Sequence, residues 1–371
     1  MTKTTYPTII QVTSFYPPHL GGMENCVQEI SRQLTKDNYS VNIFTSNIGV
    51  QAKTDDSKTP PVHRLSSIEF AHTPIIFSLF SRLSKVPKKS IIHVHIAQAL
   101  TPEIVLLISK LRHIPYITHI HLDVDASGIF GIFLAPYKRL FLTPVLRNAA
   151  KVICLSQEQK KEITEKYNLP DKKVIVIPNG VGSEYFLKRS IKDKGHIHIL
   201  FVGRLVKQKN LSLLINAVSR VKQNIILDIV GDGEERKNLE ELVKKLKITN
   251  VFFHGEKHGV ELLLFYKNAD IFAMPSLKEG VSLSLLEAMA TGLPVIASDV
   301  TGMQDLVSGC GILVKDPNIQ SFAQAIKKLA GNTQLRQEFS QHSQSKAKEF
   351  SWKKTVMKIE EIYKEVQNDF K

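Results

Sequence analysis

Cysteine is scarce in this sequence. The 371 residues include three cysteines, Cys26, Cys154 and Cys310, and their spacing matches neither a disulfide framework nor a metal-binding motif. An odd number of scattered thiols is expected of small core residues in a protein of the reducing cytosol. The sequence therefore predicts neither a disulfide-stabilised secreted domain nor a cysteine-ligated zinc module.

Long uninterrupted apolar runs are also missing. Residues 1–7 lack the apolar segment of a signal peptide and lead directly into a predicted strand. The longest apolar-looking region, residues 128–146, is interrupted by two prolines and by Lys138 and Arg139, which excludes a membrane-spanning helix. We therefore expect a cytoplasmic protein.

What the sequence does contain is ample apolar material and an excess of basic residues. Hydrophobic residues make up 43% of the chain, and its length suits two globular domains. The formal net charge is +14, and residues 58–151 alone hold 12 basic residues against 4 acidic ones. Such a local excess predicts an anionic partner, either nucleic acid, a lipid headgroup surface or a phosphorylated acceptor.

Predicted strands and helices alternate through both halves of the chain. The apolar runs that predict buried strands lie at residues 7–13, 41–45, 91–96, 116–121, 151–155, 174–177, 196–201, 225–230, 251–254, 270–274 and 295–297. Helices are predicted at residues 24–36, 102–112, 157–168, from 211 onward, at 260–267 and 282–291, twice within 317–349, and at 352–370. This alternation predicts parallel sheets covered by helices on both faces. Residues 47–61 are polar and rich in turn formers, which predicts a loop.

The most informative stretch begins at a predicted strand, residues 270–274. Glu279 lies in the loop that follows this strand, and Glu287 lies eight residues further on, inside a predicted helix. Between them, residues 280–283 offer backbone N–H groups at a helix N-terminus, which suits anionic phosphate oxygens. The stretch therefore combines acceptors for hydroxyl groups with a site for an anion.

The segment PSLKEGVSLSLLEAMATGLPVIAS, with Glu279 and Glu287 separated by seven residues, resembles the donor-site motif of the retaining glycosyltransferases of family four. The resemblance implies the GT-B fold, in which two doubly wound Rossmann-like α/β domains face each other across a deep cleft. It also implies that Glu279 binds hydroxyls of the donor sugar and that Glu287 binds the nucleotide ribose. The backbone amides of Gly280, Val281, Ser282 and Leu283 are then donor-binding groups. The family usually has Gly-Phe-Gly after the first glutamate; here Ser282 replaces the second glycine and narrows the pocket. The alternative is an ordinary strand–helix–strand crossover whose glutamates are solvated.

Two basic residues early in the second half fit the same resemblance. Arg204 and Lys209 follow the strand predicted at residues 196–201, where the family has an arginine and a lysine that clamp the donor diphosphate. Fixed cations there can stabilise the charge that grows on a nucleoside diphosphate leaving group. The alternative is a pair of solvated loop cations. A Gly-x-Gly turn at residues 231–233 is a poor dinucleotide fingerprint, because Arg236 occupies the place of the third glycine.

The first half supplies further candidates. Gly21 and Gly22 precede a helix and resemble the glycine-rich loop that faces the donor phosphates, although a tight strand-to-helix turn would use glycines equally. His121 stands where the family has the histidine that contacts the donor sugar near the reacting carbon, and we expect it to donate a hydrogen bond. His119 lies on the same face of the predicted strand and is a supporting candidate. For both histidines the alternative is a core histidine with a backbone partner.

Two features of residues 123–146 allow other interpretations. Asp123-Val124-Asp125 has the form of the metal-binding triplet of the other large glycosyltransferase fold, but the surrounding layout favours the metal-free fold, so we expect no metal site. Residues 128–146 interleave apolar residues with cations. They are interpreted either as an interfacial membrane element or as a helix packed on its own sheet.

These features predict a metal-independent retaining hexosyltransferase. The donor is expected to be a nucleotide diphosphate sugar, with UDP favoured, which acts as co-substrate in place of a cofactor. The acceptor is expected to be a glycan or lipid-linked molecule of cell-envelope or exopolysaccharide synthesis, reached at the inner face of the membrane through residues 128–146. The predicted domains are residues 1–180 and 196–351, joined by a linker at 181–195, with the helix at 352–371 packed on the first domain. The alternatives are a sugar-nucleotide epimerase of the same fold and a basic nucleic-acid-binding protein, although the sequence lacks a basic–aromatic recognition motif.

Overall fold

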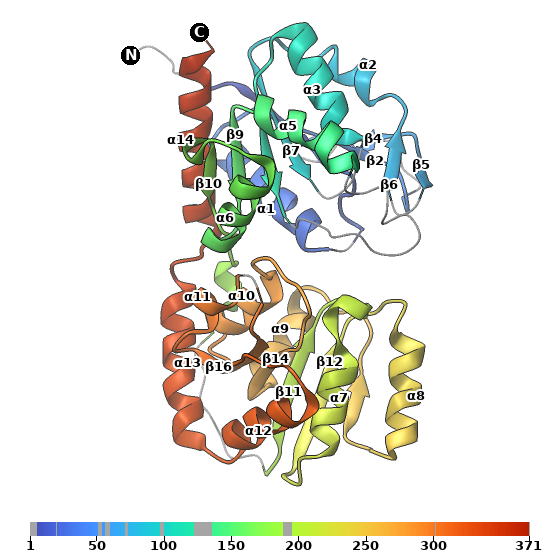
Figure 1. Cartoon of the computed structure of the whole chain (residues 1–371), viewed down its shortest axis with the longest axis vertical. Helices are drawn as coiled ribbons and strands as arrows, with labels where there is room; N and C mark the ends of the chain where they lie inside the picture. Colours follow the sequence, from blue (N-terminus) through green and yellow to red (C-terminus); the bar gives the residue numbers. More distant parts are fainter. Residues whose placement is uncertain are drawn as a thin grey trace. The chain divides into compact units, whose positions relative to one another are not determined.

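A computed structural model describes residues 6–19, 21–50, 54–55, 60–70, 73–96, 100–121, 136–187, 195–300 and 302–370. The chain divides into two units (Figure 1). The first unit consists of residues 1–178 and 352–371, and the second of residues 179–351.

The first unit is built on an eight-stranded sheet in the order β10-β9-β8-β7-β1-β2-β4-β3. Its neighbouring strands are parallel except for the short edge strand β3. The strand order reverses between β1 and β7, so this is a doubly wound sheet with its switch point there. The strands are β1 (Thr8–Val12), β2 (Val41–Ser46), β3 (Thr54–Asp55), β4 (Val62–Leu65), β7 (Ser90–Ile96), β8 (Tyr116–Ile120), β9 (Lys151–Cys154) and β10 (Val174–Val176).

Helices cover this sheet, and a hairpin extends the unit. The hairpin, β5 (Ser67–Phe70) and β6 (Thr73–Ile76), and the strands β3 and β4 were not predicted, and β3 lies within the predicted loop at residues 47–61. Polar residues interrupt β4, and its Arg64 is nevertheless buried and donates to the carbonyl oxygen of Pro17. The helical segments are α1 (Gly22–Lys36), α2 (Leu79–Leu83), α3 (Thr101–Arg112), the π-helical turn η1 (Lys138–Leu142), α5 (Thr143–Asn148), α6 (Gln157–Tyr167), η2 (Asp171–Lys173) and α14 (Trp352–Asp369).

The second unit contains a six-stranded parallel sheet in the order β13-β12-β11-β14-β15-β16, with its switch point between β11 and β14. The strands are β11 (Ile197–Val202), β12 (Ile225–Val230), β13 (Val251–Phe253), β14 (Ile271–Met274), β15 (Val295–Ser298) and β16 (Gly311–Val314). The helical segments are η3 (Ser183–Tyr185), η4 (Lys207–Lys209), α7 (Leu211–Ser219), α8 (Arg236–Leu246), α9 (Gly259–Asn268), α10 (Leu283–Ala290), α11 (Gln304–Val307), α12 (Ile319–Ala330) and α13 (Thr333–Ala347).

The strand β16 and the helices α8 and α11 of this unit were not predicted from the sequence. The edge strand β16 is short, and three of its four residues are only partly buried. Helix α8 is strongly polar and buries Leu239 alone. The short β16 gives little signal, whereas Leu239, Leu242, Val243 and Leu246 of α8 have the spacing of an amphipathic helix, a signal that was not used.

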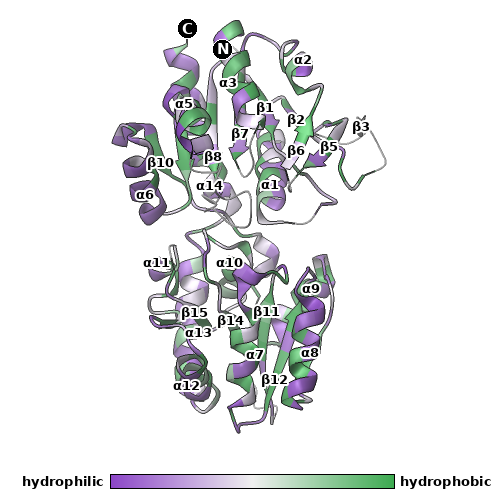
Figure 2. Cartoon of the chain, turned by 45° about the vertical axis from the view of Figure 1, so that its right-hand side comes forward, coloured by the Kyte–Doolittle hydropathy of each residue, from purple (hydrophilic) through white to green (hydrophobic). Residues whose placement is uncertain are grey.

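Each sheet is the apolar centre of its own unit. In Figure 2 the central strands are coloured hydrophobic, whereas the outer faces of α6 and α8 are hydrophilic. Fully buried residues such as Ile92 and Val94 of β7 belong to the first core, and Phe201 and Ile229 belong to the second. This arrangement follows from parallel sheets that are covered on both faces.

The boundary between the units falls between Pro178 and Asn179. The N–H of Val181 donates to the carbonyl oxygen of Phe350 at 2.7 Å, which ties the start of the second unit to its last residues. The described parts of the expected linker, residues 181–187 and Gly195, therefore belong to the second unit. Residues 188–194 lie outside the described residues.

The last helix, α14, belongs to the first unit. The hydroxyl group of its buried Tyr363 is 2.7 Å from Nδ1 of His93, in the centre of the sheet. Near the edge of the sheet, Lys151 of β9 pairs with Glu365 at 2.6 Å. A buried hydrogen bond and an ion pair thus connect two segments separated by more than 200 positions in the sequence.

We expect Tyr363→Phe to lower the free energy of unfolding by about 1–3 kcal/mol, because it leaves Nδ1 of buried His93 without a partner. Denaturant unfolding measures this difference. The matched control is Tyr6→Phe, since the side chain of Tyr6 is 43% exposed. Equal stability of Tyr363→Phe and the wild type would contradict the importance of this contact.

Candidate functional site

Two loops meet at the switch point of the second sheet. One follows β11 and carries Arg204 and Lys209, and the other follows β14 and carries Ser276 and Glu279. Because β11 and β14 are adjacent parallel strands, their carboxyl ends lie at the same edge of the sheet. Ligands of doubly wound folds bind at this position.

Glu279 is the centre of this arrangement. Its side chain is buried, and its Oε1 pairs with Nζ of Lys209 and accepts a hydrogen bond from Oγ of Ser276 at 2.8 Å. Its other oxygen, Oε2, has no donor among the residues that the structure describes. An oriented carboxylate with one open oxygen can accept a hydrogen bond from a ligand hydroxyl.

Backbone contacts hold the two loops against each other. The N–H of Leu277 donates to the carbonyl oxygen of Gln208 at 2.8 Å, and Nε2 of Gln208 donates to the carbonyl oxygen of Lys278, also at 2.8 Å. These reciprocal bonds fix Lys209 and Glu279 from both sides. Gln208 and Ser276 were not identified from the sequence, because a loop-to-loop contact leaves no local pattern.

The N-terminus of α10 lies directly after Glu279. Its first backbone hydrogen bond runs from Leu286 N–H to the carbonyl oxygen of Ser282 at 3.2 Å, and no side chain caps the helix. Among the described residues, no group accepts from the amides of residues 280–283. The carbonyl group of Val281 is held by Nδ2 of Asn179 at 2.8 Å, which orients this turn. Open amides at a helix N-terminus attract an anion.

Glu287 lies one turn into α10, in a partly buried position. The hydroxyl group of Tyr266 donates to its Oε2 at 2.7 Å, and the hydroxyl of Tyr185 donates as well. Burial dominates over these hydrogen bonds and raises the pKa of Glu287 to about 7, with a smaller contribution from Glu184. The two tyrosines were not identified from the sequence, because they come from different segments.

Arg204 is exposed, and no acidic side chain of the described residues pairs with it. Its loop is held by a bond from Leu205 N–H to the carbonyl oxygen of Asp232 at 2.8 Å. Gly231 allows this close approach: a Cβ atom there would lie 2.0 Å from the carbonyl oxygen of Gly203. The glycines at 231 and 233 therefore serve backbone packing beside Arg204, in agreement with the rejection of a dinucleotide fingerprint.

In the first unit, a chain of three side chains ends at His121. Nε2 of His95 lies 2.8 Å from Oε1 of Gln11, and Nδ1 of His95 lies 2.9 Å from Nε2 of His121. The Gln11 oxygen can only accept, so Nε2 of neutral His95 donates and its Nδ1 accepts from His121. His121 therefore keeps an unprotonated Nδ1, which accepts hydrogen bonds, whereas the sequence analysis expected it to donate.

His121 belongs to a stack of four imidazole rings, His93, His95, His119 and His121, with centroid separations of 4.4–5.4 Å. Burial lowers the pKa of His93 to about 3 and that of His121 to about 4, and it lowers those of His95 and His119 well below the ordinary value. All four rings are therefore neutral at pH 7. The pair at 93 and 95 repeats the spacing of 119 and 121 on the neighbouring strand, a signal that the sequence analysis did not use.

The environment of His119 differs from that of an ordinary core histidine. Neither ring nitrogen of buried His119 has a hydrogen-bond partner among the described residues, so the backbone partner of a core histidine is absent there. At the start of α1, a Cβ atom on Gly21 would lie 2.2 Å from the carboxylate of Glu24. The atom in the way is the end of a flexible side chain that can move, and a Cβ on Gly22 would meet open space, so these contacts do not require glycine at either position. Contact of either glycine with the donor stays a prediction.

Residues 122–135, with Asp123 and Asp125, lie outside the described residues. The described remainder of the apolar segment has two faces. Leu142, Val145 and Leu146 are buried in the core, whereas Leu140 and Phe141 are 64% and 54% exposed. No helix within the described parts of the chain is both long and apolar enough to span a membrane.

Comparison with protein families matches both units. Residues 20–185 match the family described as Glycosyltransferase Family 4, and residues 183–346 match the family described as Glycosyl transferases group 1. Together the two matches cover residues 20–346.

Individual relatives align along nearly the whole chain. An uncharacterized glycosyltransferase of Methanocaldococcus jannaschii is 27% identical over 97% of this chain and 99% of its own length. The UDP-Gal:alpha-D-GlcNAc-diphosphoundecaprenol alpha-1,3-galactosyltransferase of Escherichia coli is 28% identical over 93% of this chain and 94% of its own. Sucrose-phosphate synthase of Thermosynechococcus elongatus superimposes with a TM-score of 0.79 and 20% identity, covering 97% of this chain and 99% of that one. The fold class predicted from the sequence, GT-B with Rossmann-like domains, is confirmed.

The pKa of Glu287 predicts how stability depends on pH. Its folded-state value, about 7, is higher than its ordinary value, 4.5, so the folded protein binds a proton there more tightly. This contribution is complete below about pH 4.5 and is lost as the pH rises through about 7. We expect Glu287→Gln to be up to about 3 kcal/mol more stable than the wild type at pH 8 and similar to it at pH 4.5.

Denaturant unfolding at several pH values measures this difference. Glu361→Gln is the control, because Glu361 is exposed on α14. A stability difference between Glu287→Gln and the wild type that stays constant from pH 4.5 to 8 would contradict the raised pKa.

Proposed function

We propose, from the premise that this chain is a group 1 glycosyltransferase of the family-four type, that it transfers a hexose from a UDP-sugar to a lipid-linked or glycan acceptor with retention of configuration. The observation that carries this proposal is the buried Glu279, paired with Lys209 and followed by the open amides of α10 at the switch point of the second sheet. A hydroxyl acceptor, a cation and an anion site thus lie within one short region. A nucleotide sugar requires all three.

Each group has a role that its surroundings support. Oε2 of Glu279 accepts from a sugar hydroxyl, while the amides of residues 280–283 and the remaining N–H donors of Lys209 bind the diphosphate. Exposed Arg204 adds a planar cation for the same phosphates. Glu287 accepts from the ribose hydroxyls, with Tyr185 and Tyr266 holding its carboxylate.

The chemical step depends on charge that develops on the leaving group. As the bond between the sugar and the diphosphate breaks, negative charge grows on the phosphate oxygens. Arg204, Lys209 and the α10 amides are fixed before the reaction, so they stabilise this charge without reorganising. These groups support a metal-independent reaction. Retention is expected from attack on the same face, assisted by the leaving phosphate, and no protein nucleophile is assigned. His121, through its unprotonated Nδ1, is suited to accept from a sugar or acceptor hydroxyl.

The choice of donor and acceptor has separate support. The Escherichia coli relative is named for a UDP-sugar and a diphosphoundecaprenol acceptor. In this chain, Leu140 and Phe141 are exposed beside α3, where Leu107 and Leu111 are 48% and 61% exposed. Exposed basic residues occur on the same and adjoining helical segments, namely Lys110 on α3, Arg139 on η1 and Arg147 on α5. An apolar surface with cations suits the anionic face of a membrane that carries such an acceptor.

We expect purified protein to release hexose from UDP-sugars in a screen of UDP-, GDP- and ADP-sugars.

Arg204→Ala should lower the rate of hexose release by about 10²–10³-fold and weaken donor binding, since it removes a fixed cation. Glu279→Gln should abolish transfer with the fold intact by circular dichroism. The exposed variant Glu361→Gln is the control. Full turnover in either site variant would remove the role assigned to that residue, and conversion to an epimeric nucleotide sugar would support the epimerase alternative.

Membrane association is tested with vesicles that contain anionic lipid. Replacing Leu140 and Phe141 together by serine should shift the protein from the vesicle pellet to the supernatant, because the apolar surface is lost. The matched control replaces Phe252, which is 46% exposed in the second unit. Unchanged sedimentation of the double variant would refute a membrane role for this surface.

A further inference from the structure

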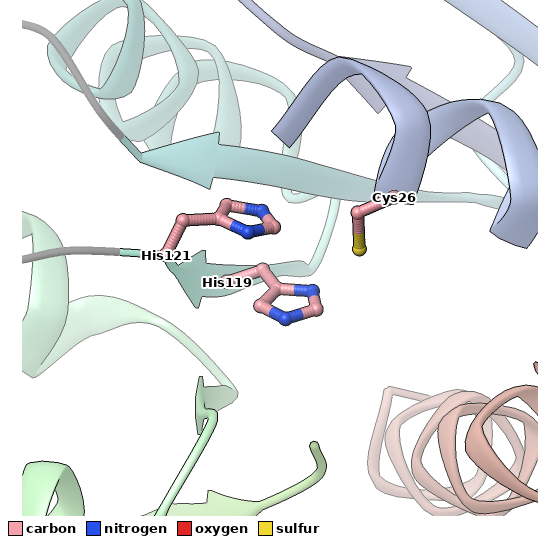
Figure 3. A group of neighbouring side chains, drawn as sticks. All are labelled: Cys26, His119 and His121. Carbon is pink, nitrogen blue, oxygen red and sulfur yellow. The ribbon is translucent and has the colours of Figure 1, made fainter. Parts of the chain in front are cut away.

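Three potential metal ligands meet in the first unit between α1 and β8 (Figure 3). Cys26 comes from α1, and His119 and His121 come from the end of β8 and the residue after it. Their ligand atoms all lie within 4.8 Å of one another. We propose that these three residues bind one divalent metal ion of the zinc class.

The fold brings these residues together for simple reasons. Side chains alternate along a strand, so His119 and His121 face the same side of the sheet. Helix α1 packs on this side with a buried stripe that includes Cys26. In Figure 3 the sulfur atom of Cys26 lies beside the two imidazole rings.

His119 provides the observation that points to a ligand. Its side chain is 1% exposed, yet neither Nδ1 nor Nε2 has a partner among the described residues. A buried polar group without a partner costs free energy, and native structures rarely leave one unsatisfied. Coordination of a metal ion by one nitrogen would satisfy it.

His121 is already oriented as a metal ligand. Histidines that bind metals usually donate their second N–H to another side chain, which fixes the ring and its tautomer. Here Nε2–H of His121 donates to His95, which in turn donates to Gln11. Nδ1 of His121 is therefore the nitrogen that remains for a metal ion.

A second group, His93, His95 and His119, also has close ligand atoms. However, both ring nitrogens of His95 are engaged with Gln11 and His121, and Nδ1 of His93 is engaged with Tyr363. That group therefore offers fewer free lone pairs. Cys26 and the free nitrogens of His119 and His121 make the better site.

The donor set selects the kind of metal. One thiolate and two imidazoles suit zinc and cobalt, whereas magnesium and calcium prefer oxygen ligands. Tetrahedral zinc would place these ligand atoms about 3.3–3.6 Å apart. The present spread of up to 4.8 Å therefore has to contract by side-chain rotation. Three protein ligands leave a fourth position open to water or a substrate group.

Metal binding would regulate the reaction. This consequence rests on the proposed function, in which the free nitrogen of His121 contacts a hydroxyl group. A metal ion on that nitrogen removes the contact, so zinc is expected to inhibit transfer. The metal site itself does not depend on the enzymatic role.

Binding is tested on the reduced full-length protein with Co²⁺ as the probe. We expect one equivalent to produce a thiolate-to-cobalt charge-transfer band that Zn²⁺ abolishes by displacement. Loss of a side chain that hydrogen-bonds to a metal ligand typically weakens metal binding by about 10–100-fold. Cys26→Ala and His119→Asn remove ligands themselves, so each should weaken cobalt binding by more than this. Cys310→Ala is the matched control, because Cys310 is also a buried free cysteine. Absence of the band in the wild type, or unchanged binding in Cys26→Ala, would overturn the proposal.

Activity assays separate this proposal from the enzymatic one. Metal-free Cys26→Ala should transfer sugar at the wild-type rate and should resist inhibition by Zn²⁺. A cobalt band in a protein that transfers no sugar would overturn the proposed function and leave the metal site standing. Equal zinc inhibition of Cys26→Ala and the wild type would refute regulation through this site.

Discussion

The ion pair between Lys209 and Glu279 joins the two loops on which the donor site depends. It connects the carboxyl ends of β11 and β14, which are adjacent strands separated by about 70 positions in the sequence. Both side chains are largely removed from solvent, so each charge requires the other. Ser276 and the hydrogen bonds through Gln208 then fix the geometry of the pair. A preorganised site of this kind can stabilise developing charge without first rearranging.

Both units use the same topology for different chemistry. Each sheet reverses its strand order at one place, between β1 and β7 in the first unit and between β11 and β14 in the second. The second unit places charges and open amides there. The first unit places neutral imidazoles there, with Gln11 on β1 and His95 on β7 at the start of the chain that orients His121. Burial keeps these rings uncharged, so they serve as hydrogen-bond partners or metal ligands and not as cations.

The two carboxylates of the motif have different partners. Glu279 has a lysine partner, whereas Glu287 has only tyrosine hydroxyls, and its pKa rises to about 7. The two glutamates are eight positions apart in one motif. Their environments nevertheless differ, because one faces the lysine loop and the other faces α9 and the η3 turn.

The sequence by itself determined the order of strands and helices, the parallel sheets and the motif that contains Glu279 and Glu287. Those features are encoded by periodicity and by short spacings, which act within one or two neighbouring elements. The missed elements include short strands such as β4 and β16, whose apolar pattern is weak. Only the tertiary structure brought Tyr185 and Tyr266 to Glu287, paired Gly231 with the backbone of Gly203, and assembled Cys26 with four histidines from two strands. Such contacts join residues that are distant in the sequence, and they exist only after the whole sheet and its helices have packed together.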